Sequence, residues 1–291
     1  MSVPAVTLRG SDRGRAVRGG AFRALLYFSV AIGFVLLGTL LVDVLQKGIP
    51  FVDGVLLTEP SSSLPERAGA GPAIRGTIYM MVLLLVMVVP LGVGTAVYLE
   101  EYANRERWYN RLLEINIQNL AAVPSIVYGI LGLAFLVRGL GLGRVLLAGA
   151  MILTLLVLPT VIVASREALR AVPDSIRQGA YALGATKWQV VWRQVLPNAI
   201  PGVATGSILA LARAIGETAP LLLVGALTYV AVDPTLLGPF TALPVQIYQW
   251  ISRPQEDFRL LAAAGIIVLL AILLVMNGFA IWIRNRYQRR W

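Results

Sequence analysis

The chain contains no cysteine and no histidine among its 291 residues. The missing thiols exclude disulfides and thiolate metal sites, and the missing imidazole removes the commonest general base and metal ligand near neutral pH. Charged residues are also scarce, at 14%, whereas a soluble domain carries about a quarter. The long apolar runs of the chain hold no clustered pair of carboxylates to stand in for the missing groups. These absences argue against most hydrolases and metalloenzymes, including a membrane-embedded enzyme.

Apolar residues make up 57% of the chain, and they gather in six runs of about 20 residues or more. A helix of that length rises 1.5 Å per residue and can cross ~30 Å of hydrocarbon. The first run is too long for a signal-peptide core and lacks a clear small-residue cleavage site. We therefore predict an all-α fold, a polytopic transmembrane helical bundle of six spans. The predicted spans are residues 24–45, 77–99, 118–137, 144–164, 201–227 and 260–283.

The spans divide the chain into four parts. Residues 1–23 are expected to form a flexible basic arm, and residues 24–76 hold the first transmembrane helix and a loop rich in Pro, Ser and Gly. Residues 77–283 form the core with spans two to six, interrupted by a polar basic segment at 166–199. Residues 284–291 are a basic tail. A functional site is expected in the core.

Positive charge is distributed unevenly along the chain. The formal net charge is +10, and 17 of the 25 Lys and Arg residues lie in the arm, the tail and the segments near 100–117 and 166–199. Lys and Arg collect on the cytoplasmic side of membrane proteins. With six spans, both termini are then cytoplasmic. The basic charge is explained by topology and does not indicate nucleic-acid binding, although the arm is also suited to contact anionic headgroups of the lipid bilayer.

The fifth predicted span carries two charged residues, Arg213 and Glu217, four positions apart. A charge near the centre of a bilayer costs on the order of 3 kcal/mol or more, so it persists where it is paired or serves transport. On a helix the two side chains share a face and can pair. Arg213 lies about 11 residues into the span, roughly 16 Å deep and near the midplane. The pair is therefore either a structural ion pair at a subunit interface or part of an anion pathway.

The basic segment at 166–199 has the pattern of two short helices. Pro173 opens the first helix, where its missing N–H does no harm, and Gly184 interrupts the pattern with a turn. Trp188, Val191, Trp192 and Val195 then form an apolar stripe. Two short helices joined at a glycine are either a pair lying on the membrane surface or a knob presented to a partner protein.

Nothing in this segment can bind ATP by a P-loop. Gly179 and Gly184 have the spacing of the two P-loop glycines, but Ala185 follows where the phosphate-binding lysine is required. Energy for any ATP-driven process must therefore come from a partner protein.

The same segment resembles the EAA loop of bacterial ABC importer permeases. The resemblance rests on Gln178-Gly179-Ala180, Gly184 and Leu196-Pro197, which have the spacing of that loop. In that family the loop forms a coupling helix that docks in a groove of the ATPase subunit. Gln178 replaces the family's Glu and Gly179 its Ala, so a salt bridge to the ATPase at position 178 is not expected. We call residues 174–197 the coupling segment.

Other motifs are more specific. Residues 119–132 (NLAAVPSIVYGILG) resemble the third-span signature of phosphate-specific (Pst) permeases, and residues 212–220 (ARAIGETAP) resemble their intramembrane charged signature. Residues 98–102 (YLEEY), 167–173 (EALRAVP) and 240–248 (FTALPVQIY) favour the A-type subunit over its C-type sister. The chain thus resembles the A-type permease subunit of a phosphate-specific ABC importer, within the binding-protein-dependent transport permeases. The resemblance covers about residues 70–291.

The resemblance implies a type I ABC importer permease fold in the inner membrane of a bacterium. It also implies a complex with a sister permease, two ATPase subunits that hold ATP and Mg, and an external phosphate-binding protein, with no cofactor in this chain. ATP-driven closure would push on residues 174–193 and alternate access to a pathway near Arg213. The residues expected to line the phosphate pathway are Arg213, Glu217, Thr218, Ser125 and Tyr128. The residues expected to couple to the ATPase are Gln178, Gly179, Ala180, Gly184, Ala185, Leu196 and Pro197.

Four alternatives remain open on sequence alone. The chain could carry another oxyanion, such as sulfate or molybdate, or act alone as a secondary transporter or channel. Arg213 and Glu217 could form a structural pair without touching substrate. Ser125 and Tyr128 could serve only the kink expected at Pro124, because a proline in a span frees a backbone carbonyl that needs a partner.

Overall fold

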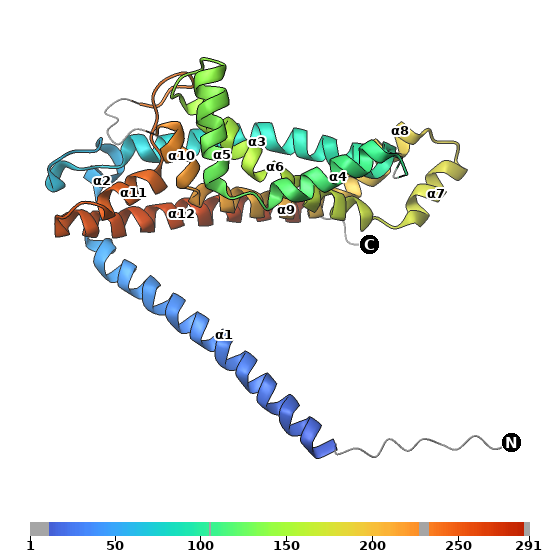
Figure 1. Ribbon diagram of the computed structural model, residues 1–291, viewed down its shortest axis with the longest axis horizontal. Helices are drawn as coiled ribbons and strands as arrows, with labels where there is room; N and C mark the ends of the chain where they lie inside the picture. Colours follow the sequence, from blue (N-terminus) through green and yellow to red (C-terminus); the bar gives the residue numbers. More distant parts are fainter. Residues whose placement is uncertain (1–11, 105, 227–232, 288–291) are drawn as a thin grey trace.

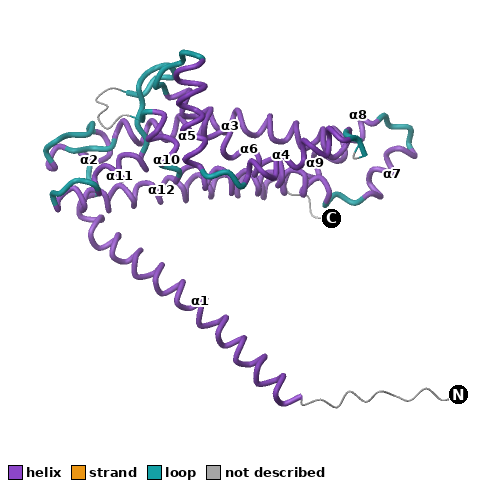
Figure 2. The backbone as a smooth tube through the Cα atoms, viewed as in Figure 1, coloured by secondary structure: helices purple, strands orange, loops and turns teal. Residues whose placement is uncertain are grey.

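The computed structural model describes residues 12–104, 106–226 and 233–287, and these residues form helices and turns without a strand (Figure 1). Figure 2 shows the same arrangement, with long helices joined by short loops. The elements are α1 (Asp12–Gly48), η1 (Ile49–Phe51), α2 (Gly54–Thr58), η2 (Pro65–Arg67), α3 (Gly71–Val97), η3 (Tyr98–Tyr102), α4 (Trp108–Ala121), α5 (Ser125–Gly132), η4 (Leu133–Gly139), α6 (Leu146–Arg170), α7 (Asp174–Ala182), α8 (Lys187–Val190), η5 (Val191–Val195), α9 (Leu196–Gly216), α10 (Ala219–Val224), α11 (Leu243–Ile251) and α12 (Glu256–Tyr287).

Five helical stretches in the described residues are long and apolar enough to cross a bilayer. They are Arg18–Phe51, Gly71–Tyr102, Leu146–Arg170, Lys187–Gly216 and Glu256–Arg286. A further candidate is the pair formed by α4 and α5–η4, whose two parts are bent by 104°. The expectation of six spans holds when this bent pair counts as one crossing.

The third span expected at 118–137, with a kink at Pro124, is not one continuous helix. Residues 118–121 belong to the end of α4, and a new helix starts at Ser125 after a break at Ala122-Val123-Pro124. Pro124 has φ −57° and ψ 139° and cannot donate a backbone hydrogen bond. A proline also disfavours the helical conformation in the residue before it. The expected kink is therefore a break that turns the chain through 104°.

The fifth span also differs from the expected 201–227. The helical stretch begins at Lys187 inside the coupling segment and ends at Gly216, and a second short helix, α10, follows. Glu217 is in an extended conformation, with φ −74° and ψ 113°. Pro220 lies in the first turn of α10 and has no N–H to bond back toward α9, which supports the break. Residue 227, the expected end of the span, lies outside the described residues.

The N-terminal region is more helical than expected. Helix α1 begins at Asp12, so the flexible conformation expected for residues 12–23 is wrong, whereas residues 1–11 lie outside the described part. The loop expected at 46–76 contains short helices, and α3 begins at Gly71 inside it. Figure 1 shows α1 joining the other helices at its C-terminal end and extending away from them toward its N-terminus, and α1 contacts α12. The basic tail is described only as far as residue 287.

Small residues allow α6 and α9 to pack closely. A Cβ built on Gly202 would lie 2.6 Å from Cβ of Ala168, and a Cβ on Gly206 would collide with Cβ of Ala164. Small residues at four-residue spacing on both helices let the backbones approach, which is how helices associate in lipid without a hydrophobic driving force. The α6–α9 pair, with α3 against α6, forms the rigid centre from which the broken helices extend.

Candidate functional site

The two broken spans meet each other. Gly129 of α5 lies against the first turn of α10, where a Cβ built on Gly129 would be 2.8 Å from Cα of Pro220. Figure 1 shows α5 standing across the long direction in which α3 and α12 run. Transporters place discontinuous helices of this kind where backbone lines a substrate site rather than lipid. The break after α4 and the break after α9 are therefore the part of the fold most suited to hold an ion.

Arg213 and Glu217 lie at the second break. Arg213 occupies the last turn of α9, and Glu217 is the first residue after that helix. The Nε atom of Arg213 is 3.4 Å from Oε1 of Glu217, longer than the 2.7–2.9 Å typical of a charge-assisted hydrogen bond. The pair expected from the four-residue spacing is present, but it is loose. The negative end of the α9 helix dipole also stabilises the positive charge of Arg213, because Arg213 lies at the C-terminus of that helix.

The Arg213 guanidinium faces away from the interior of this chain. Its side chain is 53% exposed, whereas that of Glu217 is 17% exposed. Among the described residues, Glu217 is the recorded hydrogen-bond and ion-pair partner of Arg213, and it contacts only Nε. Both terminal nitrogens are therefore available to an anion or to a neighbouring subunit. This geometry is compatible with both functions considered for the pair.

Thr218 and Ser125 lie at the two breaks but are not joined to the charged pair. The Thr218 hydroxyl donates a long hydrogen bond of 3.4 Å to the Gly216 carbonyl, and the side chain is half-buried. Ser125 is the first residue of α5 and is also half-buried. No hydrogen bond connects either residue to Arg213 in the described part of the chain. They lie near the expected pathway without forming one closed site within this chain.

Tyr128 is oriented into the chain rather than into an open space. It is 8% exposed, and its hydroxyl donates a 2.9 Å hydrogen bond to the carbonyl of Leu120 in the last turn of α4. The bond spans the break at Pro124 and adds a second donor to a carbonyl that also accepts a 3.2 Å hydrogen bond from the Val123 amide. Tyr128 thus braces the bend, and contact with substrate through its hydroxyl would require this bond to open.

The coupling segment has the expected shape of two short helices joined at a glycine. Helix α7 ends at Ala182, and Gly184 follows with a φ of +79°, a conformation that favours glycine because it has no Cβ. The amide of Ala185 donates to the carbonyl of Ala180 at 3.1 Å, and the amide of Gly184 donates to Tyr181 at 2.9 Å, which is a Schellman motif. Helix α8 then starts with a capping box between Thr186 and Gln189, a signal present in the sequence but overlooked above.

Most of the expected coupling residues lie on the surface. Gln178, Gly179, Gly184 and Pro197 are exposed, and Ala180, Ala185 and Leu196 are half-buried. The most exposed apolar side chain is Leu183 at the end of α7, 90% exposed. The single apolar stripe expected here is wrong. Val191 and Val195 are buried, whereas Trp188 and Trp192 are exposed and pack together with ring centroids 4.9 Å apart.

A group of ion pairs beside the coupling segment was missed by sequence reasoning. Glu100 and Glu101, in the π-helical turn η3, meet arginines from α6 and α7. Arg170 of α6 bonds Glu100 at 2.9 Å, and Arg177 of α7 bonds Glu101 at 2.8 Å. A signal existed, because adjacent acids end one predicted span and basic residues follow the end of another. The sequence did not show that these two ends are neighbours.

A wide groove of about 980 Å³ lies between α3, α8–α9 and α12. Its walls are apolar, with Trp188, Trp192 and Tyr102 among them. None of the five residues expected for the pathway lines it. An apolar groove does not suit a hydrated oxyanion, because it offers too few groups to replace water. It is therefore separate from the candidate site at the two breaks.

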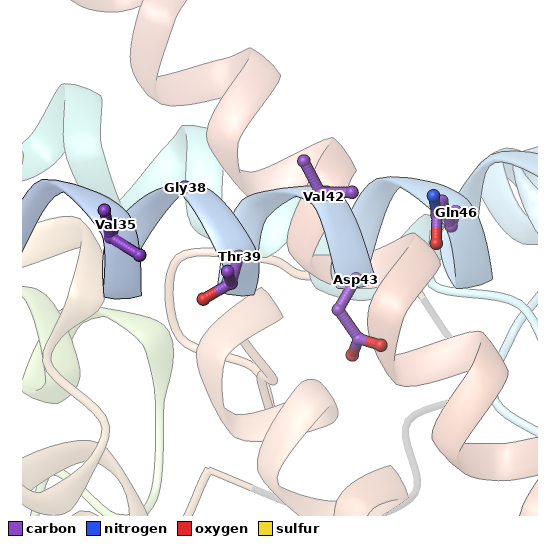
Figure 3. A pocket seen from close by; sticks show the side chains of 6 residues that line it. All are labelled: Val35, Gly38, Thr39, Val42, Asp43 and Gln46. Atoms are coloured by element: carbon purple, nitrogen blue, oxygen red, sulfur yellow. The ribbon is translucent and has the colours of Figure 1, made fainter.

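A smaller depression on α1 is a helix surface rather than a site. Figure 3 shows that its lining residues all come from this one helix. They include Asp43, whose carboxylate pairs with Lys47 at 2.7 Å. The described residues also contain no group of three or more acidic side chains that could hold a metal ion. The candidate site therefore remains the pair of helix breaks with Arg213.

Comparisons with known proteins agree with this architecture. The sequence profile of the family described as "Binding-protein-dependent transport system inner membrane component" matches residues 88–289. The phosphate transport system permease protein PstA 1 of Mycobacterium tuberculosis is 37% identical over 230 residues, covering 78% of this chain and 75% of the relative. The phosphate transport system permease protein PstA of Mycobacterium leprae is 33% identical over 293 residues, covering 99% and 95%. Similarity thus extends beyond the 70–291 expected above.

The fold is also that of solved importers. A bacterial alginate ABC transporter, solved in complex with an alginate-bound periplasmic protein, superposes with a TM-score of 0.65 at 16% identity, covering 92% of this chain and 94% of the other. The all-α transmembrane bundle and the type I permease fold are confirmed, and so is the expectation of a transport subunit rather than an enzyme. The chain belongs to the family of binding-protein-dependent transport system inner membrane components, the permease subunits of ABC importers, and it is similar to the Pst A-type permeases within it.

Proposed function

We propose that this chain forms half of the phosphate pathway of an ATP-driven importer and that a sister permease completes it. The observation that supports this proposal most is the half-exposed Arg213 at the break after α9, with both terminal nitrogens of its guanidinium unused among the described residues. The relatives named as phosphate transport permeases supply the substrate class.

Phosphate at neutral pH is a mixture of mono- and dianion and leaves water only for strong donors. A guanidinium presents planar donors that match two phosphate oxygens at once. Glu217 orients Arg213 through Nε and keeps the empty pathway from holding an unpaired cation. The same carboxylate repels phosphate, which weakens binding and favours release. Thr218 and Ser125 supply further hydroxyls near the two breaks.

The coupling segment docks on an ATPase subunit in this proposal. The exposed Leu183 and the Schellman turn at Gly184 form a rigid apolar projection, which is the kind of anchor that fills a pocket in a partner. A second ATPase subunit docks on the sister permease, and the ATPases hold ATP and Mg. An external binding protein delivers phosphate on the opposite side of the membrane. The basic charge of the arm and tail supports a cytoplasmic location for both termini at the inner membrane.

The test is uptake by the purified complex reconstituted in proteoliposomes with the binding protein outside and ATP inside. Radiolabelled phosphate should accumulate, and a large excess of unlabelled phosphate should suppress the signal, whereas the same excess of sulfate or molybdate should leave it unchanged. Vesicles that lack the ATPase subunits should take up no phosphate. Competition by sulfate or molybdate would identify another oxyanion as substrate. Uptake without the ATPases would identify a secondary transporter or channel.

A further inference from the structure

Arg177 joins the first coupling helix to the ends of two spans. Its Nη2 lies 2.8 Å from Oε1 of Glu101, in the turn η3 that ends α3. The same guanidinium donates to the carbonyls of Leu169 at 2.9 Å and Val172 at 2.7 Å, at the C-terminal end of α6. One side chain therefore holds α7, the end of α3 and the end of α6 together.

The Leu169 carbonyl lies in the last turn of α6 and also accepts a 3.3 Å hydrogen bond from the Val172 amide, and the Val172 carbonyl lies two residues beyond the helix. The last carbonyls of a helix have no intrahelical donor, and an arginine is a suitable partner because its charge also complements the negative end of the helix. Glu101 is only 9% exposed, so its interaction with Arg177 is screened much less than a surface ion pair. Arg177 thus connects α7 to three residues outside it, Glu101, Leu169 and Val172, through four hydrogen bonds.

The neighbouring residue, Glu100, continues the connection. Arg166 of α6 lies 3.5 Å from Glu100 and 2.8 Å from Glu114 of α4. The turn η3 is π-helical, and such turns recur at functional sites because they redirect side chains within a helix. The acidic pair Glu100-Glu101 therefore contacts residues of α6 and α7, and Arg166 extends the group to α4.

Helix α4 leads directly to the candidate site. It ends at Ala121, and the hydrogen bond from Tyr128 to Leu120 holds its last turn to α5 across the break. Helix α5 packs against α10, the helix that follows Glu217. A continuous series of packed helices, ion pairs and hydrogen bonds thus runs from α7 to the break beside Arg213. Such a series can carry a displacement if its members move as a unit.

We infer that Arg177 and Glu101 are positioning residues that transmit the movement of the coupling helix to α3 and α6, and through Arg166 to the break that holds Arg213. This inference rests on the proposed function of the chain as an ATP-driven importer subunit. Without the Arg177–Glu101 bond, α7 moves with the ATPase while the spans lag behind. More ATP is then hydrolysed for each phosphate transported.

The experiment compares Glu101→Gln with wild type in the full reconstituted complex. Glutamine keeps the size of the side chain and removes its charge, while Arg177 keeps its two carbonyl bonds. The matched control is Glu167→Gln, which removes a carboxylate that is 65% exposed and pairs with Arg170 of the same helix. ATP hydrolysis and phosphate uptake are measured in the same vesicles, with and without the binding protein.

We expect Glu101→Gln to lower the phosphate transported per ATP roughly 2- to 30-fold, the range found for residues that couple distant sites. Hydrolysis should persist and become less dependent on the binding protein, whereas Glu167→Gln should match wild type. An unchanged ratio would overturn the inference, and so would a parallel loss of hydrolysis and uptake, because that result indicates a purely stabilising role.

Two further measurements keep the outcome decisive. If Glu101→Gln does not assemble, Arg177→Lys replaces it, since lysine keeps the charge but lacks the planar, five-donor guanidinium that reaches Glu101 and both carbonyls. It should show the same fall in phosphate per ATP, and a wild-type ratio would overturn the inference. If the wild-type complex takes up no phosphate, the proposed substrate fails. The inference is then judged by whether Glu101→Gln makes hydrolysis less dependent on the binding protein.

Discussion

Replacing Arg213 with glutamine removes the guanidinium at the break after α9. Glu217 contacts only Nε of Arg213, at 3.4 Å, so the two terminal nitrogens of the guanidinium can donate hydrogen bonds to phosphate. A hydrogen bond to a charged group contributes about 1.5–3 kcal/mol. Loss of even one such bond lowers the rate about 10- to 150-fold at low phosphate, because each 1.4 kcal/mol corresponds to a factor of ten. Uptake by Arg213→Gln should therefore fall to background.

The matched variant is Glu217→Gln, which removes the competing carboxylate and leaves Arg213 in place. Phosphate should then bind more tightly and leave more slowly, so KM and kcat for uptake should both fall. The assay is the initial rate of uptake into proteoliposomes over a range of phosphate concentrations, after gel filtration has shown that each variant assembles with its partners. An assembled Arg213→Gln complex with wild-type uptake would refute the pathway role and leave the pair as a structural contact.

Three other substitutions test the local structure. Gly184→Val should abolish co-purification with the ATPase, because a φ of +79° costs about 1–2 kcal/mol for a residue with a Cβ. Gly184→Asn should retain co-purification, because asparagine tolerates this conformation. Gly206→Leu should force α6 and α9 apart and lower the free energy of unfolding by about 1–3 kcal/mol, measured as a fall in melting temperature in detergent. The control is Gly94→Leu, which should leave the melting temperature unchanged because a Cβ at Gly94 meets nothing within 4 Å. Tyr128→Phe should cost about 0.5–1.5 kcal/mol in the same melting assay, because Leu120 loses its donor across the break.

The spans could be predicted because hydropathy over about 20 residues reports directly on burial in lipid. Their breaks could not be predicted from proline alone. Pro90 and Pro159 lie inside the continuous helices α3 and α6, whereas Pro124 and Pro220 accompany breaks. A proline in a span is tolerated when neighbouring helices satisfy the freed carbonyl, and that depends on packing that the sequence does not display.

The charged pair could be predicted because residues four apart share a helical face. The contacts around the charged pair could not be predicted, because they depend on how segments distant in the sequence pack together. The contact between Gly129 and Pro220 joins α5 to α10, and the bond between Arg177 and Glu101 joins residues 76 positions apart. The turn at Gly184 was visible in the sequence because a glycine there interrupts a helical pattern, and the structure shows the positive φ that requires it.

The most direct test of the account is the occupancy of the pathway. The complex is arrested with a non-hydrolysable ATP analogue in the presence of the loaded binding protein and radiolabelled phosphate, and bound phosphate is counted after rapid filtration. The binding protein's own phosphate is subtracted with a control that lacks the permeases. The account predicts phosphate retained by the wild-type permeases and lost from Arg213→Gln in an equally assembled complex. Equal retention by both complexes would contradict it.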